Sequence, residues 1–171
     1  MKVLIIYSSK SGVSRKCAEM IGERLENSMQ IDIFDIKDGA PSPEGYDVAV
    51  IGGSIRMDRL NKDLRKYLKA NAEELNKINT ALFLCCGMTD CFEDYVKLNF
   101  PKTVVPALGI HYFGGELKPD KLKGIDKLIV RSMRSSINYE DFEAPDHEKA
   151  PLPEMIPENV YRLADSIRAL L

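Results

Sequence analysis

The chain contains no tryptophan, two histidines and four cysteines. The histidines lie far apart in the sequence, and the cysteines lack the paired spacing of a zinc site, so the sequence predicts no bound metal. In a reducing compartment a domain of this size needs no disulfides, and we expect the thiols to be small buried side chains. Cys91 is the one that could instead face a binding site.

Long apolar runs and a strong excess of charge are also missing. No segment approaches the length that spans a membrane, and the start of the chain lacks the apolar core and cleavage site of a signal peptide. With 24 Lys and Arg against 26 Asp and Glu, the net charge of −2 gives no field that would attract nucleic acid. We therefore expect a soluble, cytoplasmic protein, and 171 residues suffice for a single domain.

The most informative pattern lies at the start of the chain. An unbroken apolar run at 3–7 leads into the hydroxyl-rich stretch 8–14, after which apolar residues recur three and four positions apart. This change of period predicts a strand, a tight loop and a helix, and the first N–H groups of such a helix favour an anion. The stretch is therefore a candidate phosphate-binding loop. Its residues are Ser8, Ser9, Lys10, Ser11, Gly12, Val13 and Ser14.

The composition of this loop suits a phosphate held mainly by neutral donors. Each serine hydroxyl can donate a hydrogen bond, and Gly12 lets the backbone approach without a Cβ in the way. The dinucleotide fingerprint needs three spaced glycines, and the nucleoside-triphosphate loop ends in Gly-Lys-Ser or Gly-Lys-Thr; neither pattern is present. The remaining alternative is a serine-rich turn that caps the helix and binds nothing.

Residues 5–18, Ile-Ile-Tyr-Ser-Ser-Lys-Ser-Gly-Val-Ser-Arg-Lys-Cys-Ala, resemble the flavodoxin signature, with Ser14 in place of the usual final threonine. The serine keeps the hydroxyl oxygen of the threonine. In flavodoxins this loop holds the phosphate of FMN. The resemblance therefore implies that FMN is the cofactor and that the loop binds its phosphate.

The rest of the chain alternates between strand and helix patterns. Further strands are expected at 31–36, 47–51, 81–85 and 104–113, and helices over 60–75, 92–99, 121–134 and 160–167. The alternation of 31–36 and the missing N–H of Pro106 place the second and fifth strands at sheet edges. The parallel order 2-1-3-4-5 meets both conditions. The fold class is thus α/β, a flavodoxin-like doubly wound five-stranded parallel sheet in a three-layer α/β/α arrangement.

We expect the whole chain, 1–171, to form one flavodoxin-like domain. The stretch 138–157 is rich in Pro, Asp and Glu and predicts an irregular surface strap. The stretch 121–134 predicts an amphipathic helix that covers the sheet. Peripheral contact of this helix with a membrane surface is the alternative.

Three loops are expected to meet at the carboxyl edge of the sheet, where ligands bind in open α/β folds. They are residues 8–14, 52–57 and 86–91. The resemblance to flavodoxins implies that the second and third loops flank the isoalloxazine ring, although neither contains an aromatic residue; a plain strand-to-helix turn is the alternative for 52–54. The candidate cofactor-binding residues in these two loops are Gly53, Ser54, Ile55, Arg56, Met57, Cys86, Gly87, Met88, Thr89, Asp90 and Cys91.

The stretch from Val50 to Arg56 and the pattern from Leu108 to Met133 look more specifically like the flavodoxin-like branch that contains menaquinone-dependent protoporphyrinogen oxidase. This resemblance implies an FMN-dependent oxidoreductase that passes electrons from a reduced substrate to an acceptor such as a quinone. FMN is then the reactive group, and no side chain need be catalytic. Arg56 is a candidate contact for a carboxylate or phosphate, or else a solvated surface residue.

A flavodoxin-type electron carrier that exchanges electrons with a redox partner protein is the main alternative. Carriers of that family tend to be strongly acidic, and the mild net charge here gives little steering. A response regulator would need an aspartate where Gly52 and Gly53 stand, and a low-molecular-weight phosphatase would need a Cys followed six positions later by Arg, which is absent. A regulatory domain of this fold with an empty site stays open.

Overall fold

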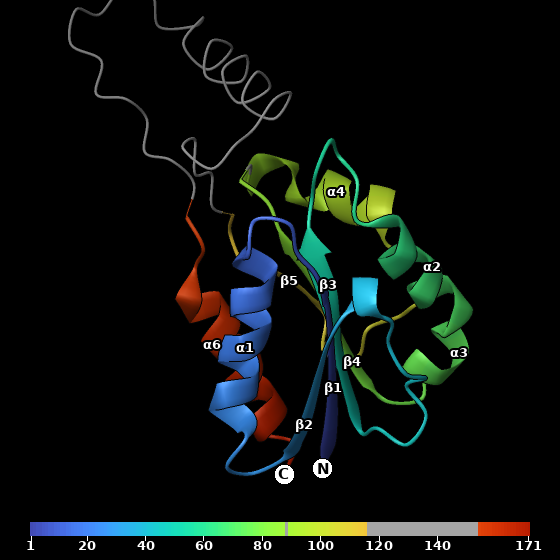
Figure 1. Cartoon of the computed structure of the whole chain (residues 1–171), viewed down its shortest axis with the longest axis vertical. Helices are drawn as coiled ribbons and strands as arrows, with labels where there is room; N and C mark the ends of the chain where they lie inside the picture. Colours follow the sequence, from blue (N-terminus) through green and yellow to red (C-terminus); the bar gives the residue numbers. More distant parts are fainter. Residues whose placement is uncertain (88, 116–153) are drawn as a thin grey trace, which may run out of the picture. The chain divides into compact units, whose positions relative to one another are not determined.

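A computed structural model describes residues 1–87, 89–115 and 154–171. Five parallel strands form one sheet in the order β2-β1-β3-β4-β5, which confirms the expected fold (Figure 1). The strands are β1 (Lys2–Ser8), β2 (Gln30–Asp35), β3 (Val48–Ser54), β4 (Asn79–Cys85) and β5 (Ile110–Tyr112).

Helices cover both faces of this sheet (Figure 1). The first face carries α1 (Val13–Leu25) and α6 (Pro157–Arg168), and the second carries α2 (Lys62–Ala70), α3 (Ala72–Leu75) and α4 (Phe92–Asn99). Alternate residues of β1 enter the two cores: Val3 and Ile5 pack on the α1 side, whereas Leu4 and Ile6 pack on the α2 side. All four are fully buried, as expected for a parallel strand that is covered on both faces.

Two elements differ from the sequence prediction. The fifth strand was expected over 104–113 but covers only Ile110–Tyr112, because the chain turns at Gly109, whose N–H donates to the carbonyl of Pro106 at 3.0 Å. Gly109 takes a φ of +82°, which interrupts an extended strand. The helix expected over 60–75 is divided at Asn71, whose side-chain amide donates to the carbonyl of Tyr67 at 2.9 Å.

Residues 88 and 116–153 lie outside the described part of the chain. The expected helix at 121–134 and most of the expected strap at 138–157 fall there, and the single-domain organisation stays a prediction. At the end of the strap, Met155 forms an antiparallel bridge with Gly114, and Pro157 is already the first residue of α6. None of the described helices combines the length and the apolar character needed to cross a membrane.

Candidate functional site

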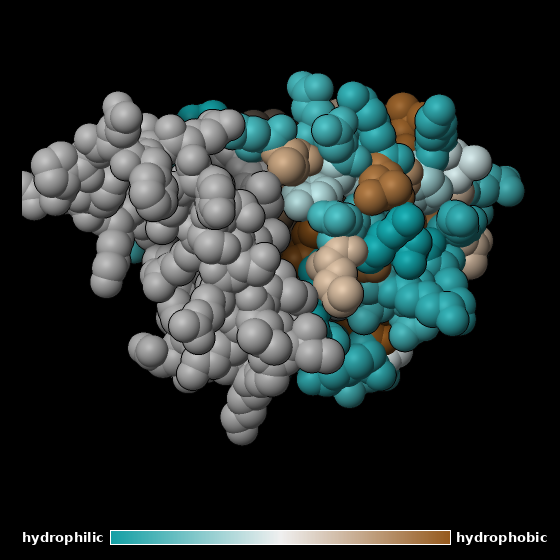
Figure 2. Space-filling view, turned by 90° about the horizontal axis from the view of Figure 1, so that it is seen from above, coloured by the Kyte–Doolittle hydropathy of each residue, from teal (hydrophilic) through white to brown (hydrophobic). Residues whose placement is uncertain are grey.

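The carboxyl ends of β1, β3 and β4 lie next to one another at the upper edge of the sheet in Figure 1. Ser8 pairs in register with Gly53, and Ser54 pairs with Cys85. The N–H of Ile55 then donates to the carbonyl of Cys85 at 3.0 Å. The structure therefore brings together the three loops that the sequence placed at one edge. Figure 2 looks onto this edge and shows a mostly hydrophilic described surface, broken by separate hydrophobic residues.

The loop between β1 and α1 has the geometry of an open anion-binding site. Gly12 is the N-cap of α1 with a φ of +96°, and a Cβ built on it would meet no described heavy atom within 4 Å. Among the described residues, no side chain caps the first turn of α1, and that turn contains no acidic residue. The partial positive charge at the start of this helix is therefore not offset by its own first turn.

The serines of this loop have different partners. Ser9 Oγ accepts a hydrogen bond from the N–H of Gly12 at 3.0 Å, which leaves the Ser9 hydroxyl proton to be donated elsewhere. Ser14 is fully buried, and its hydroxyl oxygen lies 2.7 Å from that of Ser54. Ser11 is exposed, as is its neighbour Lys10. The loop thus presents exposed donors at its tip and a hydrogen bond to the β3 loop at its base.

Val13 contributes to this loop in another way than the serines. Its side chain is 4% exposed and packs in the α1 core. Only its backbone N–H therefore remains for a ligand, and the side chain anchors the first turn of α1 to the sheet. Ser8, at the end of β1, is also buried.

The two glycines that end β3 are required by close packing. A Cβ on Gly53 would lie 2.8 Å from the carbonyl oxygen of Ser8, and one on Gly52 would lie 2.0 Å from that of Phe83. A side chain at either position would push apart strands whose ends form the site. The Gly-Gly pair therefore has a structural reason that does not depend on a ligand.

A two-residue turn follows β3 and was not predicted. Arg56 and Arg59 exchange two backbone hydrogen bonds of 3.0 Å across Met57 and Asp58, which have φ values of 48° and 61°. Such turns favour Asn and Gly, because other residues pay about 1–2 kcal/mol each for a left-handed backbone. Met57 is 72% exposed at the tip. Aspartate is common in such turns but methionine is not, so the sequence carried only a weak signal for this one.

The loop after β4 is supported from the side by the chain that follows β5. The Tyr112 hydroxyl donates to the carbonyl of Cys86 at 2.9 Å. A Cβ on Gly115 would lie 2.5 Å from the carbonyl carbon of Cys86 and 2.6 Å from the nitrogen of Gly87. Sequence reasoning missed this support, which depends on a contact between residues far apart in the chain.

The other candidates of this loop are distributed unevenly. Cys91 is half-buried and packs against the core on the α2 side, within a helical turn at Thr89–Cys91. Asp90 is exposed. Met88 lies outside the described residues.

A buried pair of thiols lies beneath the site. Cys17 Sγ and Cys85 Sγ are 4.0 Å apart, and both side chains are almost completely buried. The hydrogen bond with Cys85 and the burial raise the pKa of the Cys17 thiol far above its ordinary value. Cys17 therefore stays neutral, as expected for a small buried side chain.

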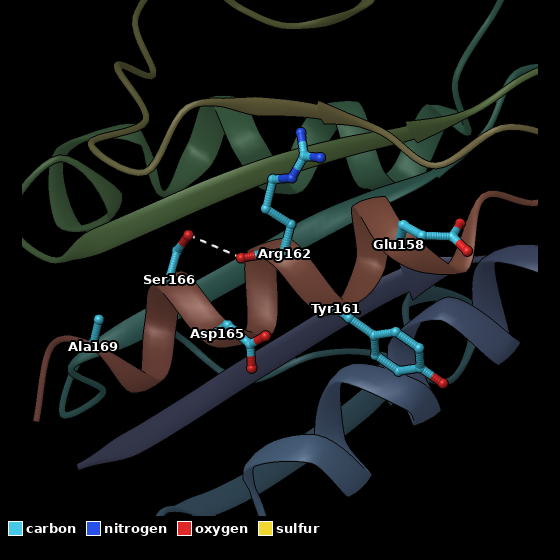
Figure 3. A pocket seen from close by; sticks show the side chains of 6 residues that line it. All are labelled: Glu158, Tyr161, Arg162, Asp165, Ser166 and Ala169. Atoms are coloured by element: carbon cyan, nitrogen blue, oxygen red, sulfur yellow. Dashed lines mark hydrogen bonds between the residues drawn. The ribbon is translucent and has the colours of Figure 1, made fainter.

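A second hollow lies away from this edge, on the outer surface of α6 (Figure 3). Two of its polar groups already have partners: Ser166 donates to the carbonyl of Arg162 at 2.9 Å, and Asp165 pairs with Arg24 at 3.0 Å. None of the predicted site residues lines it. Its lining residues are Glu158, Tyr161, Arg162, Asp165, Ser166 and Ala169.

Comparisons with known proteins agree with this geometry. A family model described as a flavodoxin domain matches residues 4–143. Among solved structures, a short-chain flavodoxin associated with a bacterial microcompartment superimposes with a TM-score of 0.53 at 10% identity, covering 99% of this chain and 98% of the flavodoxin. At that identity the likeness concerns the fold.

Curated relatives carry a more specific name. The protoporphyrinogen IX dehydrogenase (quinone) of Escherichia coli is 32% identical over 85 residues, which are 48% of this chain and 47% of the relative. The protein of the same name from Leishmania major is 29% identical over 85 residues, with 48% of this chain and 37% of the relative covered. The matched region thus spans less than half the length of these relatives.

Proposed function

The chain belongs to the flavodoxin domain family, and from this premise we propose that it is an FMN-dependent oxidoreductase that passes electrons from a reduced substrate to an acceptor such as a quinone. The observation that carries the proposal is the open, uncapped start of α1, which lies at the same sheet edge as the loops after β3 and β4. A ligand with an anionic tail and a flat polar ring suits this arrangement, in which the anion-binding loop before α1 lies beside the two loops that follow β3 and β4.

The loop 8–14 holds the FMN phosphate in this proposal. The exposed hydroxyl of Ser11 and the available proton of Ser9 donate to phosphate oxygens, and the first N–H groups of α1 add charge-assisted bonds. The empty space beside Gly12 admits the phosphate close to the backbone. The residues present therefore fit the group.

The loops after β3 and β4 bind the ring. In this proposal the backbone near Gly53 and Gly87 contacts the polar edge of the ring; the missing side chain of Gly87 eases that approach, whereas the space beside Gly53 is already filled by Ser8 and Leu60. When bound, FMN supplies the electron-transfer chemistry, which protein hydrogen bonds and charges tune. Arg56, on the turn after β3, is placed to attract a carboxylate or phosphate of the substrate or cofactor.

An enzyme is favoured over an electron carrier by the curated relatives, whose name denotes a dehydrogenase that uses a quinone. A net charge of −2 also provides little steering toward a basic protein partner. A reduced tetrapyrrole and a quinone are therefore the first substrate pair to test, and other reduced substrates of similar chemistry come next.

The cofactor is tested by an absorbance spectrum of the protein as isolated, after reconstitution with FMN, and after reduction with dithionite. We expect flavin bands that bleach on reduction and a protein-to-FMN ratio of one. A protein that stays colourless after reconstitution would refute the proposal.

Turnover is tested separately on the FMN-loaded protein. Steady-state oxidation of protoporphyrinogen IX with a soluble quinone supports the enzyme. Rapid electron exchange with flavodoxin partner proteins, without turnover of any reduced small molecule, would assign the protein to the carriers instead.

A further inference from the structure

The turn Arg56–Arg59 after β3 is hydrogen-bonded to the end of α4. Asn99, the last residue of α4, is 3% exposed and uses its side-chain amide in three hydrogen bonds. Its oxygen accepts from the N–H of Leu60 at 2.7 Å, and its nitrogen donates to the carbonyls of Asp58 at 2.9 Å and Tyr95 at 3.0 Å. The buried side-chain amide of Asn99 therefore links Leu60 and Asp58, in the connection after β3, to α4. We call these hydrogen bonds the Asn99 clamp.

A second group of α4 acts on the same turn. Burial and a hydrogen bond to the Asp58 side chain raise the pKa of Tyr95 to about 12. Tyr95 precedes Asn99 by one helical turn, so the two side chains lie on the same face of α4. The backbone of Asp58 is held by the hydrogen bond that the Asn99 amide donates to its carbonyl, at 2.9 Å.

The turn needs such support because Met57 is a residue type that disfavours its left-handed backbone, whereas aspartate adopts it more readily. Met57 and Asp58 both have positive φ, and Met57 is largely exposed at the tip. Residues of these types keep a left-handed backbone when the surrounding structure imposes it. In Figure 1 the connection after β3 rises above the edge of the sheet beside α4, where the clamping hydrogen bonds are made.

We propose that Asn99 is a positioning residue of the flavin site: it fixes the turn Arg56–Arg59 as a preformed wall for the ring or for the substrate that meets it. The proposal rests on the proposed function, since it assigns the turn to that site. A preformed wall costs less ordering on binding, so loss of the clamp weakens ring binding and leaves the phosphate loop unchanged.

The chain offers a matched control. Asn71 is the C-cap of α2, and its side-chain amide donates to the carbonyl four residues earlier, Tyr67, at 2.9 Å, as the amide of Asn99 does to Tyr95. It makes no hydrogen bond with the turn. Asn71→Ala therefore removes the same local helix contact without removing the clamp.

The first measurement needs no flavin. Arg56 and Arg59 border the turn, so brief trypsin digestion of the folded apoprotein, with mass spectrometry of the fragments that end at these two residues, reports how firmly it is held. We expect Asn99→Ala to speed cleavage there about tenfold, as for a local opening made easier by the loss of two bonds. Tyr95→Phe gives a smaller increase, and Asn71→Ala gives none.

The second measurement locates the effect on binding. Asn99→Ala should weaken FMN and riboflavin, which lacks the phosphate, by the same factor of about ten, so the ratio of their affinities stays constant. The reduction potential of bound FMN should shift as well, which a loss of overall stability alone would not cause. Asn71→Ala should match the parent protein in both readouts.

The outcomes separate the two proposals. Faster cleavage with unchanged flavin affinity and potential would overturn the positioning role, and unchanged cleavage in Asn99→Ala would overturn the clamp itself. If Asn99→Ala does not fold, Asn99→Asp, which keeps an oxygen to accept from Leu60 and removes the N–H groups that donate to Asp58, decides by the same criteria. If the parent protein binds neither flavin, the proposed function fails and takes the positioning role with it, whereas the clamp is still decided by cleavage.

Discussion

Replacing Gly12 by alanine separates the strain of one backbone position from its role in binding. The φ of +96° places an alanine in the left-handed region, while the open space around the added methyl group excludes a clash with described atoms. The cost to folding is therefore the backbone term alone, about 1–2 kcal/mol. For a chain of this size that is a fall in Tm of roughly 2–8 °C.

Gly39 is the matched control. It has a φ of +89°, also has no described atom within 4 Å of a built Cβ, and follows the 3₁₀ turn Ile36–Asp38, outside the phosphate loop 8–14. Its ψ of 162° is at least as unfavourable for alanine, so Gly39→Ala should lose at least as much stability. The two variants thus share the strain and differ only in location.

FMN titration followed by fluorescence distinguishes them. In Gly12→Ala the methyl group occupies the space through which phosphate approaches the backbone, and we expect FMN to bind at least about tenfold more weakly, or about 1.4 kcal/mol. Gly39→Ala should bind FMN as the parent does. Equal FMN affinity in Gly12→Ala and the parent, or an equal loss in both variants, would refute the assignment of this loop to the phosphate.

Three further predictions follow from other contacts. Ser9→Ala and Ser11→Ala should each weaken FMN by about 1 kcal/mol in a titration while leaving riboflavin affinity unchanged, because only the phosphate loses a donor. The hydrogen bond from the Tyr46 hydroxyl lowers the pKa of the Asp32 carboxyl. The stability that ionised Asp32 adds is therefore present above about pH 4 and is lost as the pH falls through the lowered pKa. Urea denaturation should show that the difference in unfolding free energy between the parent protein and Asp32→Asn vanishes at low pH. In Gly115→Ala the added methyl group should displace the backbone of Cys86 and Gly87 after β4, which should lower the Tm measured by calorimetry and weaken FMN binding. An unchanged Tm would contradict the close contact.

The sheet was predictable because its information is local. Each strand shows an apolar run or an alternation, and the edge signals of the second and fifth strands are consistent with the flavodoxin-like order 2-1-3-4-5, which the structure confirms. The length of β5 was overestimated because apolar residues continue through a turn at Pro106–Gly109 that periodicity does not detect.

The site was predictable only as a set of loops. Strand ends in a parallel sheet share an edge, so the sequence alone places 8–14, 52–57 and 86–91 together. The turn at Met57 and Asp58, the clamp by Asn99 and the support from Gly115 could not, because each depends on contacts between distant residues. Asn99 in particular is an ordinary helix-ending asparagine in the sequence.

The pair of hydroxyls at the base of the site limits what that base can give to a ligand. Ser14 and Ser54 lie 2.7 Å apart, and each carries a single hydrogen on its oxygen. Because Ser14 is fully buried, only Ser54 could offer its hydrogen to a ligand, and it could do so only when Ser14 is the donor of the pair; the two together would give a phosphate oxygen at most one hydrogen. The other hydrogen bonds to a phosphate would then come from the exposed tip of the loop 8–14 and from the first backbone N–H groups of α1.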